Sequence, residues 1–99
     1  MADDFSKELT FEWDEGNETK NWIKHNVTKE EAEKVFTDRN SLVSQDLKHS
    51  EKELRWLLIG EVADRLLAIF FTIRRGKVRI ISARPASKKE RELYESTEK

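Results

Sequence analysis

Arginine side chains that could bind an anion are concentrated between Arg65 and Arg84, in the segment RLLAIFFTIRRGKVRIISAR. A guanidinium group on a rigid strand suits a phosphate or carboxylate better than a hydrophobic core, because it offers a planar fork of donors. The candidate cations of this meander, which include one from the preceding strand, are Arg55, Arg74, Arg75, Lys77, Arg79 and Arg84, and Ser82 lies among them in the return strand. A second interpretation stays open, in which arginines at strand edges only discourage aggregation between sheets.

Lys24 and His25 form a second group, at the end of the first predicted helix. Imidazole titrates near neutral pH, so His25 could transfer protons while Lys24 contacts a phosphate. The simpler interpretation of the local sequence is that two cations at a helix C-terminus complement the helix dipole. Trp22 within this helix and Trp13 before it either belong to the core or, near the cationic helix end, stack on nucleic-acid bases.

No metal or cofactor site is expected. The chain has no cysteine, which excludes a disulfide framework and a zinc–thiolate site. Its two histidines, His25 and His49, are far apart and lack a metal-ligand spacing. Tyr94 and Ser82 remain as lesser candidates for proton transfer.

The composition predicts one small domain. The chain has 99 residues, 39% of them charged, with a formal net charge of −1. A nucleic-acid binder usually has a basic excess, so only a local basic patch could serve that role here. The sequence has no apolar run of the ~20 residues needed to span a bilayer and no hydrophobic core of a signal peptide. We therefore expect a soluble cytoplasmic protein that does not associate with a membrane.

Four strands are predicted to form most of the fold. The run from Leu66 to Ile73 is apolar on both faces, as in a strand at the centre of a sheet. Residues 74–77 form a turn at Gly76, the return strand ends at Pro85, and further strands are expected at 53–62 and, more weakly, at 42–47. If the return strand is regular, Arg79 and Arg84 point to opposite faces.

Helices are expected before and after these strands. A short strand at 10–13 precedes a helix that begins at Asp14 and ends before a left-handed Asn26. Capping boxes at 28–31 and 87–90 open a second helix and a C-terminal helix whose apolar contacts are Leu93 and Tyr94. The predicted order is β-α-α-β-β-β-β-α, an α+β domain over 10–96 with helices packed on an antiparallel meander, after a flexible leader at 1–9.

Several short motifs follow one another along this chain. They are FEWD at 11–14, NWIKHNV at 21–27, EEA at 30–32, VFTD at 35–38, HSE at 49–51, RW at 55–56, IG at 59–60, FT at 71–72 and RIISAR at 79–84. In order and spacing they resemble the BrnT family, which consists of ribonuclease toxins of bacterial type II toxin–antitoxin systems. The resemblance extends from Phe11 to Tyr94, and FEWD followed by KHxV and RIISAR is its specific part.

The resemblance implies a RelE-like, barnase-like compact fold and metal-independent RNA cleavage through the 2′-hydroxyl. It implies catalytic roles for Lys24, His25, Arg74, Arg79 and Arg84. RNA contacts would come from Arg55, Ser82, Tyr94 and Trp22. The expected partner is a BrnA-like ribbon-helix-helix antitoxin, with a toxin dimer and an antitoxin dimer in the complex. The alternative is a non-enzymatic or degenerate module whose cationic face only binds its antitoxin.

Overall fold

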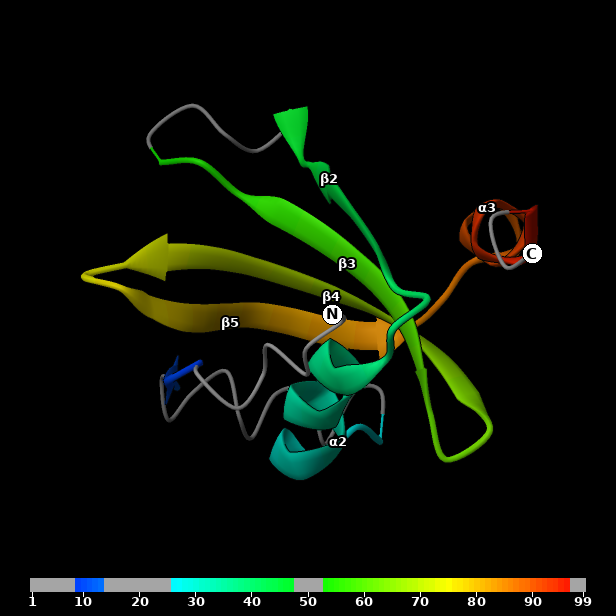
Figure 1. Ribbon diagram of the computed structural model, residues 1–99, viewed down its shortest axis with the longest axis horizontal. Coiled ribbons are helices and arrows are strands. Elements are labelled where there is room, and N and C mark those ends of the chain that lie inside the picture. The colour runs from blue at the N-terminus through cyan, green and yellow to red at the C-terminus, as the bar shows by residue number, and fades with distance from the viewer. Residues whose placement is uncertain (1–8, 14–25, 48–52, 97–99) are drawn as a thin grey trace.

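The computed structural model describes residues 9–13, 26–47 and 53–96 and shows an α+β arrangement of a sheet and helices (Figure 1). A five-stranded sheet has the order β1-β5-β4-β3-β2. The elements are β1 (Phe11–Glu12), α2 (Lys29–Lys34), the 3₁₀ helix η2 (Val35–Thr37), β2 (Leu42–Gln45), β3 (Trp56–Val62), β4 (Arg65–Arg74), β5 (Lys77–Pro85) and α3 (Lys88–Ser96). The first predicted helix, over 14–25, lies outside the described residues.

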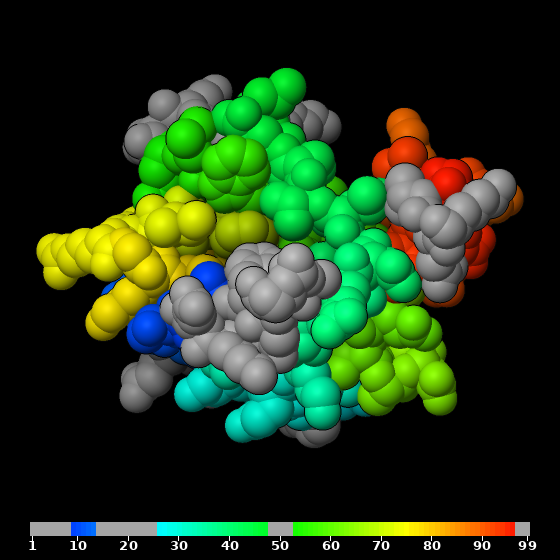
Figure 2. Space-filling model, viewed as in Figure 1, coloured from blue at the N-terminus to red at the C-terminus, as the bar shows by residue number. Residues whose placement is uncertain are grey.

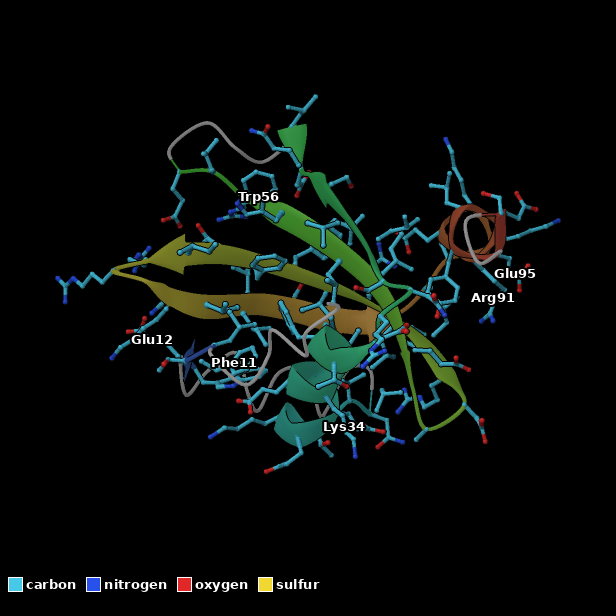
Figure 3. All side chains as sticks on the ribbon, viewed as in Figure 1. Phe11, Glu12, Lys34, Trp56, Arg91 and Glu95 are labelled. Carbon is cyan, nitrogen blue, oxygen red and sulfur yellow. The ribbon has the colours of Figure 1, made fainter. Side chains whose placement is uncertain are left out.

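The sheet is mixed, which corrects the expectation of a purely antiparallel one. Strands β2 to β5 form the predicted antiparallel meander. β1 instead pairs parallel with β5, where the Val78 amide donates to the Thr10 carbonyl at 2.8 Å. No short turn joins β1 to β5. The direction of β1 is therefore set by its contacts with other parts of the fold and not by a hairpin connection. Phe11 packs edge-on against Phe36, with ring centroids 5.2 Å apart, and lies beside the helical layer (Figure 3).

Two tight turns build the meander. Ala63 and Asp64 have φ of 50° and 66°, and Arg75 and Gly76 have φ of 55° and 76°. Two consecutive left-handed residues match the twist of the flanking strands, which is why such turns favour hairpins. Both turns lie where the sequence predicts them. Asn26 is also left-handed, as expected, with φ of 56°.

The main core lies between α2–η2 and one face of the sheet. The capping box that opens α2 is confirmed, since Thr28 Oγ1 accepts from the Glu31 amide and Glu31 Oε1 accepts from the Thr28 amide, each at 3.0 Å. The helix thereby turns its apolar side to the sheet. The buried residues of this core are Val27, Ala32, Val35, Phe36, Leu58, Val62, Leu67, Ile69, Phe71, Val78, Ile80 and Ala83.

Helix α3 packs separately and stands out as a lobe at one end of the molecule (Figure 2). Its capping box is confirmed, because Ser87 and Glu90 bond each other's backbone amides at 2.8 and 3.2 Å. Tyr94 is 3% exposed and packs with Ile59 and Leu66. Leu93 is 49% exposed, so its predicted core contact is wrong. Glu90 and Tyr94, one helical turn apart, take the side toward the sheet and turn Leu93 away.

Within residues 9–13, 26–47 and 53–96, neither helix is long and apolar enough to cross a membrane.

Candidate functional site

A bulge in β5 decides which face its arginines occupy. Phe71 pairs with Ile80 and Phe70 pairs with Ser82, so β5 has one extra residue between these pairs. Side chains alternate along a strand, and one inserted residue reverses the alternation beyond it. Arg79 and Arg84 therefore share one face of the sheet, although a regular strand would place them on opposite faces.

Burial along β5 agrees with this arrangement. Val78, Ile80 and Ala83 are all buried in the core under α2, although the last two are an odd number of residues apart. The intervening polar residues are only partly buried. On the face opposite α2 the sheet thus presents what we call the cationic face, made up of Arg55, Phe70, Arg74, Arg79, Ser82 and Arg84.

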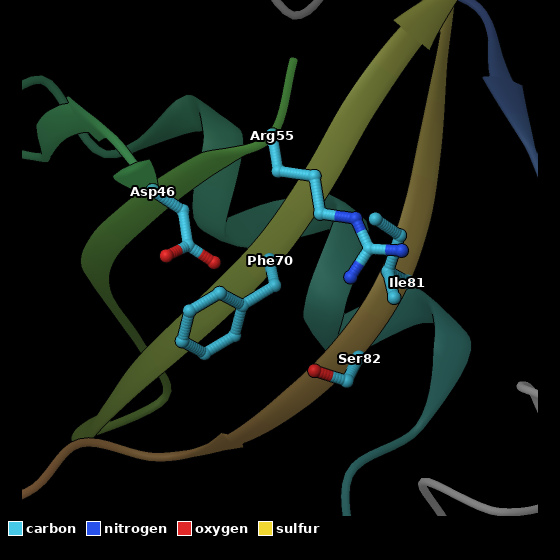
Figure 4. Close-up of a pocket in the computed structure, with 5 residues that line it drawn as sticks. All are labelled: Asp46, Arg55, Phe70, Ile81 and Ser82. Carbon is cyan, nitrogen blue, oxygen red and sulfur yellow. The ribbon is translucent and has the colours of Figure 1, made fainter. Parts of the chain in front are cut away.

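A hollow of about 210 Å³ opens on the cationic face (Figure 4). Strand β4 supplies Phe70 and strand β5 supplies Ile81 and Ser82. Arg55 directly precedes β3, and Asp46 directly follows β2. The Asp46 amide donates to the Arg55 carbonyl at 2.8 Å, which holds the end of β2 beside the start of β3. In the close-up the Asp46 carboxylate and the Arg55 guanidinium lie to either side of the Phe70 ring.

Arg84 is held in a bidentate ion pair beside this hollow. Its Nη1 and Nη2 donate to Oε1 and Oε2 of Glu90, both at 2.8 Å, and its guanidinium carbon lies 5.3 Å from the centre of the Phe70 ring. The hydrogen bonds from Arg84 lower the pKa of Glu90 and raise the pKa of Arg84. Glu90 therefore occupies the fork that a phosphate would use.

Arg74 and Arg79 of the cationic face also lie beside carboxylates. Arg74 Nη2 lies 3.0 Å from Glu53 Oε2, and this contact lowers the pKa of Glu53. Arg79 Nη1 lies 3.8 Å from Glu12 Oε2, across the β1–β5 pair. An anion arriving at the cationic face must compete with these acidic side chains.

The structure separates the remaining candidates. Tyr94 lies away from the hollow, buried under α3, where its hydroxyl donates to Asp38 Oδ2 at 2.7 Å. The Trp13 indole donates to Glu33 at 2.7 Å and so belongs to the contact with α2. The predicted Lys24, His25 and Trp22 lie outside the described residues, as does His49.

Asp46, Phe70, Ile81 and Glu90 belong to this site but were not predicted from the sequence. Asp46 could have been found by pairing 42–47 with 53–62, because it lies near the end of the first predicted strand and meets Arg55 in the second. Phe70 carries no local signal, since its neighbours in β4 are equally apolar. Glu90 is identifiable only as a capping residue, and its contact with Arg84 depends on how α3 folds back.

Among the described residues, no group of three His, Asp or Glu side chains is placed to hold a metal ion. A family model described as the ribonuclease toxin, BrnT, of type II toxin–antitoxin systems matches residues 13–90. No curated protein matches the sequence.

Proposed function

Because the chain belongs to the BrnT family of type II ribonuclease toxins, we propose that it cleaves RNA without a metal ion and thereby inhibits translation in the cytoplasm. Family membership also implies an antitoxin partner. We infer a BrnA-like ribbon-helix-helix antitoxin, bound as a dimer to a toxin dimer, and a RelE-like, barnase-like fold.

The proposed reaction is an attack of the substrate's own 2′-hydroxyl on the adjacent phosphorus. A base removes the 2′-proton as the new O–P bond forms, and an acid protonates the 5′-oxygen as its bond to phosphorus breaks. The products are a 2′,3′-cyclic phosphate and a 5′-hydroxyl. Negative charge gathers on the phosphoryl oxygens, so preorganised cations lower the barrier.

In this proposal Arg79 and Arg84 bind the phosphate, and Arg74 adds positive charge at the end of the sheet. Either His25 or Lys24 transfers the protons. Ser82 is the better of the two lesser candidates, because it lines the hollow. The bond from the Tyr94 hydroxyl to Asp38 argues against a role for Tyr94 in proton transfer.

The observation that best supports the proposal is the bulge in β5. It brings two arginines and a serine to one face of the sheet, beside a hollow that a third arginine lines. Rigid strands keep these groups at fixed separations, as binding of a phosphodiester requires.

A second candidate function is binding without catalysis, in an intact or degenerate toxin. It is favoured by the carboxylates Glu12, Glu53 and Glu90, which already contact the arginines. Acidic side chains of an antitoxin could bind the same guanidinium groups in place of these carboxylates. Both functions can coexist on one face, since an antitoxin that covers it would also exclude RNA.

RNA cleavage by the purified protein in excess EDTA separates the two functions. We expect single-stranded RNA to be cut, with 2′,3′-cyclic phosphate ends detected by mass spectrometry. Strict dependence on Mg²⁺ or Mn²⁺ would overturn the mechanism, and intact RNA would favour the binding module. Expression in bacteria should arrest growth, and coexpression of the antitoxin should restore it.

Two arginine variants test the proposed phosphate contacts. We expect Arg79→Ala and Arg84→Ala to fold and to lose about 10²–10³ in cleavage rate, the usual effect of removing one transition-state contact. Arg39→Ala is the matched control, because Arg39 is exposed in the turn before β2. His25→Ala should flatten the pH–rate profile, and an unchanged profile would assign the proton transfer to Lys24 instead. Parental cleavage by all these variants refutes the assignment.

A further inference from the structure

The hollow on the cationic face has the size and lining of a site for a single nucleotide base. Its volume of about 210 Å³ is below the ~300–1,000 Å³ typical of sites for drug-sized ligands. Phe70 and Ile81 supply apolar walls, and Asp46, Arg55 and Ser82 supply polar groups. RNA-binding proteins commonly hold an unstacked base in this way, with stacking on an aromatic ring and hydrogen bonds to the base edges.

We propose that this hollow binds guanine, with Asp46 as the residue that determines base specificity. The inference rests on the proposed RNA cleavage and adds to it a preference for RNA that carries guanosine at the cleavage site.

Guanine fits this hollow because of its pattern of hydrogen-bond donors and acceptors. An ionised carboxylate only accepts hydrogen bonds, so Asp46 favours an edge with adjacent donors. Guanine presents N1–H and the N2 amino group side by side. In adenine and cytosine a ring acceptor adjoins the amino group, and in uracil two carbonyls flank N3–H. Adenine, cytosine and uracil would therefore each place a hydrogen-bond acceptor opposite the carboxylate, which is unfavourable.

The opposite side of the hollow fits the same base. Arginine contacts with guanine O6 and N7 are the commonest base-specific contacts in DNA complexes, and Arg55 supplies a guanidinium there. Arg84 lies over one face of the Phe70 ring, and the two charged groups lie to either side of this ring (Figure 4). One base against the face that Arg84 does not cover can meet Asp46 with one edge and Arg55 with the next.

The hollow also adjoins the proposed phosphate contacts. The guanidinium of Arg84 lies 5.3 Å from the centre of the Phe70 ring, and Ser82 in the lining is two residues from Arg84 on the same face. A nucleotide whose base enters the hollow therefore brings its phosphate to the arginines of β5. This continuity would couple base recognition to the position of the cut.

Binding of oligonucleotides that cannot be cleaved tests the inference apart from catalysis. The probes are fluorescent 2′-deoxyuridine tracts that carry one guanine, hypoxanthine, adenine or cytosine. We expect guanine to bind at least ~10-fold more tightly than adenine or cytosine, within the 5- to 150-fold range of a good bidentate contact. Hypoxanthine lacks the N2 amino group and should fall between them.

Asp46→Asn should bring the affinities for guanine and adenine together, since the amide places a donor where guanine needs an acceptor. Asp64→Asn, in the turn between β3 and β4, is the matched control and should keep the parental preference. Equal binding of all bases, failure to bind any probe, or an unchanged preference in Asp46→Asn overturns the inference.

Cleavage mapping on unmodified RNA distinguishes this inference from the function on which it rests. Cuts next to guanosine support both. Cuts without base preference overturn guanine recognition and leave the ribonuclease intact. A guanine preference in binding without any cleavage supports the base site and overturns the nuclease.

Discussion

Replacing Glu90 by glutamine should destabilise the fold and at the same time tighten RNA binding. Glu90 accepts from both terminal nitrogens of Arg84 and from the Ser87 amide, each at 2.8 Å. The glutamine amide keeps one oxygen that can accept a hydrogen bond. Its NH₂ group replaces the other oxygen and is a donor that faces a donor of Arg84. The variant therefore loses one charge-assisted hydrogen bond together with the ion pair.

The expected loss of stability lies between two limits. An exposed ion pair contributes about 0–1 kcal/mol, and a hydrogen bond to a charged group about 1.5–3 kcal/mol. The side chains of Arg84 and Glu90 are 32% and 14% exposed, so solvent screens the pair only in part. We expect the free energy of unfolding to fall by about 1–2 kcal/mol, which lowers the Tm of a domain of this size by roughly 5–15 °C.

The dependence on pH gives an internal check. Folding lowers the pKa of Glu90 from its ordinary value of 4.5. A lowered folded-state pKa means that the stabilisation is complete above pH 4.5 and disappears as the pH falls through the folded-state pKa. Parent and variant should therefore differ most at neutral pH and converge in acid, as measured by urea denaturation at a series of pH values.

RNA binding should change in the opposite direction. Without the competing carboxylate Arg84 should pair with a phosphate more completely. One whole phosphate contact steepens the salt dependence of log K by about 0.7 for single strands, so the slope should steepen by up to that amount. Fluorescence anisotropy between low and moderate salt measures this slope. Glu92→Gln, on the exposed side of α3, controls for the change in net charge. Unchanged stability at neutral pH, or weaker RNA binding than the control, would contradict these two roles of Glu90.

Three further predictions concern the framework of the fold. Gly60→Ala should lower the free energy of unfolding by about 1–3 kcal/mol, because its Cβ would lie 2.7 Å from Cγ1 of the buried Val35; unchanged urea stability would contradict this. Tyr94→Phe removes the hydroxyl that donates to Asp38 and should lose about 1–2 kcal/mol while leaving RNA affinity intact. Thr28→Ala should lose about 1 kcal/mol through the missing cap of α2, with a matching fall in thermal stability by circular dichroism.

Local sequence was sufficient to predict the turns and helix caps. The capping boxes at 28–31 and 87–90 involve residues within a single turn, so their partners are known from the sequence alone. Left-handed Asn26 and Gly76 follow from the tolerance of these residue types for positive φ. The central strand β4 was predictable because apolar residues occupy both of its alternating faces.

The direction of β1 required the tertiary structure. Phe11 and Glu12 alternate like any short strand, and nothing local states which neighbour they join. Their pairing with β5 depends on the packing of Phe11 against Phe36 and on a backbone hydrogen bond to Val78. Such contacts link residues far apart in the chain, which is why a meander of neighbouring strands was predicted and a mixed sheet was found.

The arginines themselves were identified from the sequence, because guanidinium groups in an apolar strand indicate an anion site. Their common face was decided by the fold. The core under α2 takes both Ile80 and Ala83, and one additional residue in β5 lets both reach it. That insertion turns Arg79, Ser82 and Arg84 to the same side, beside Asp46 and Phe70. No glycine marks the bulge in RIISAR, so only packing across the sheet, which the linear sequence does not contain, could reveal this site.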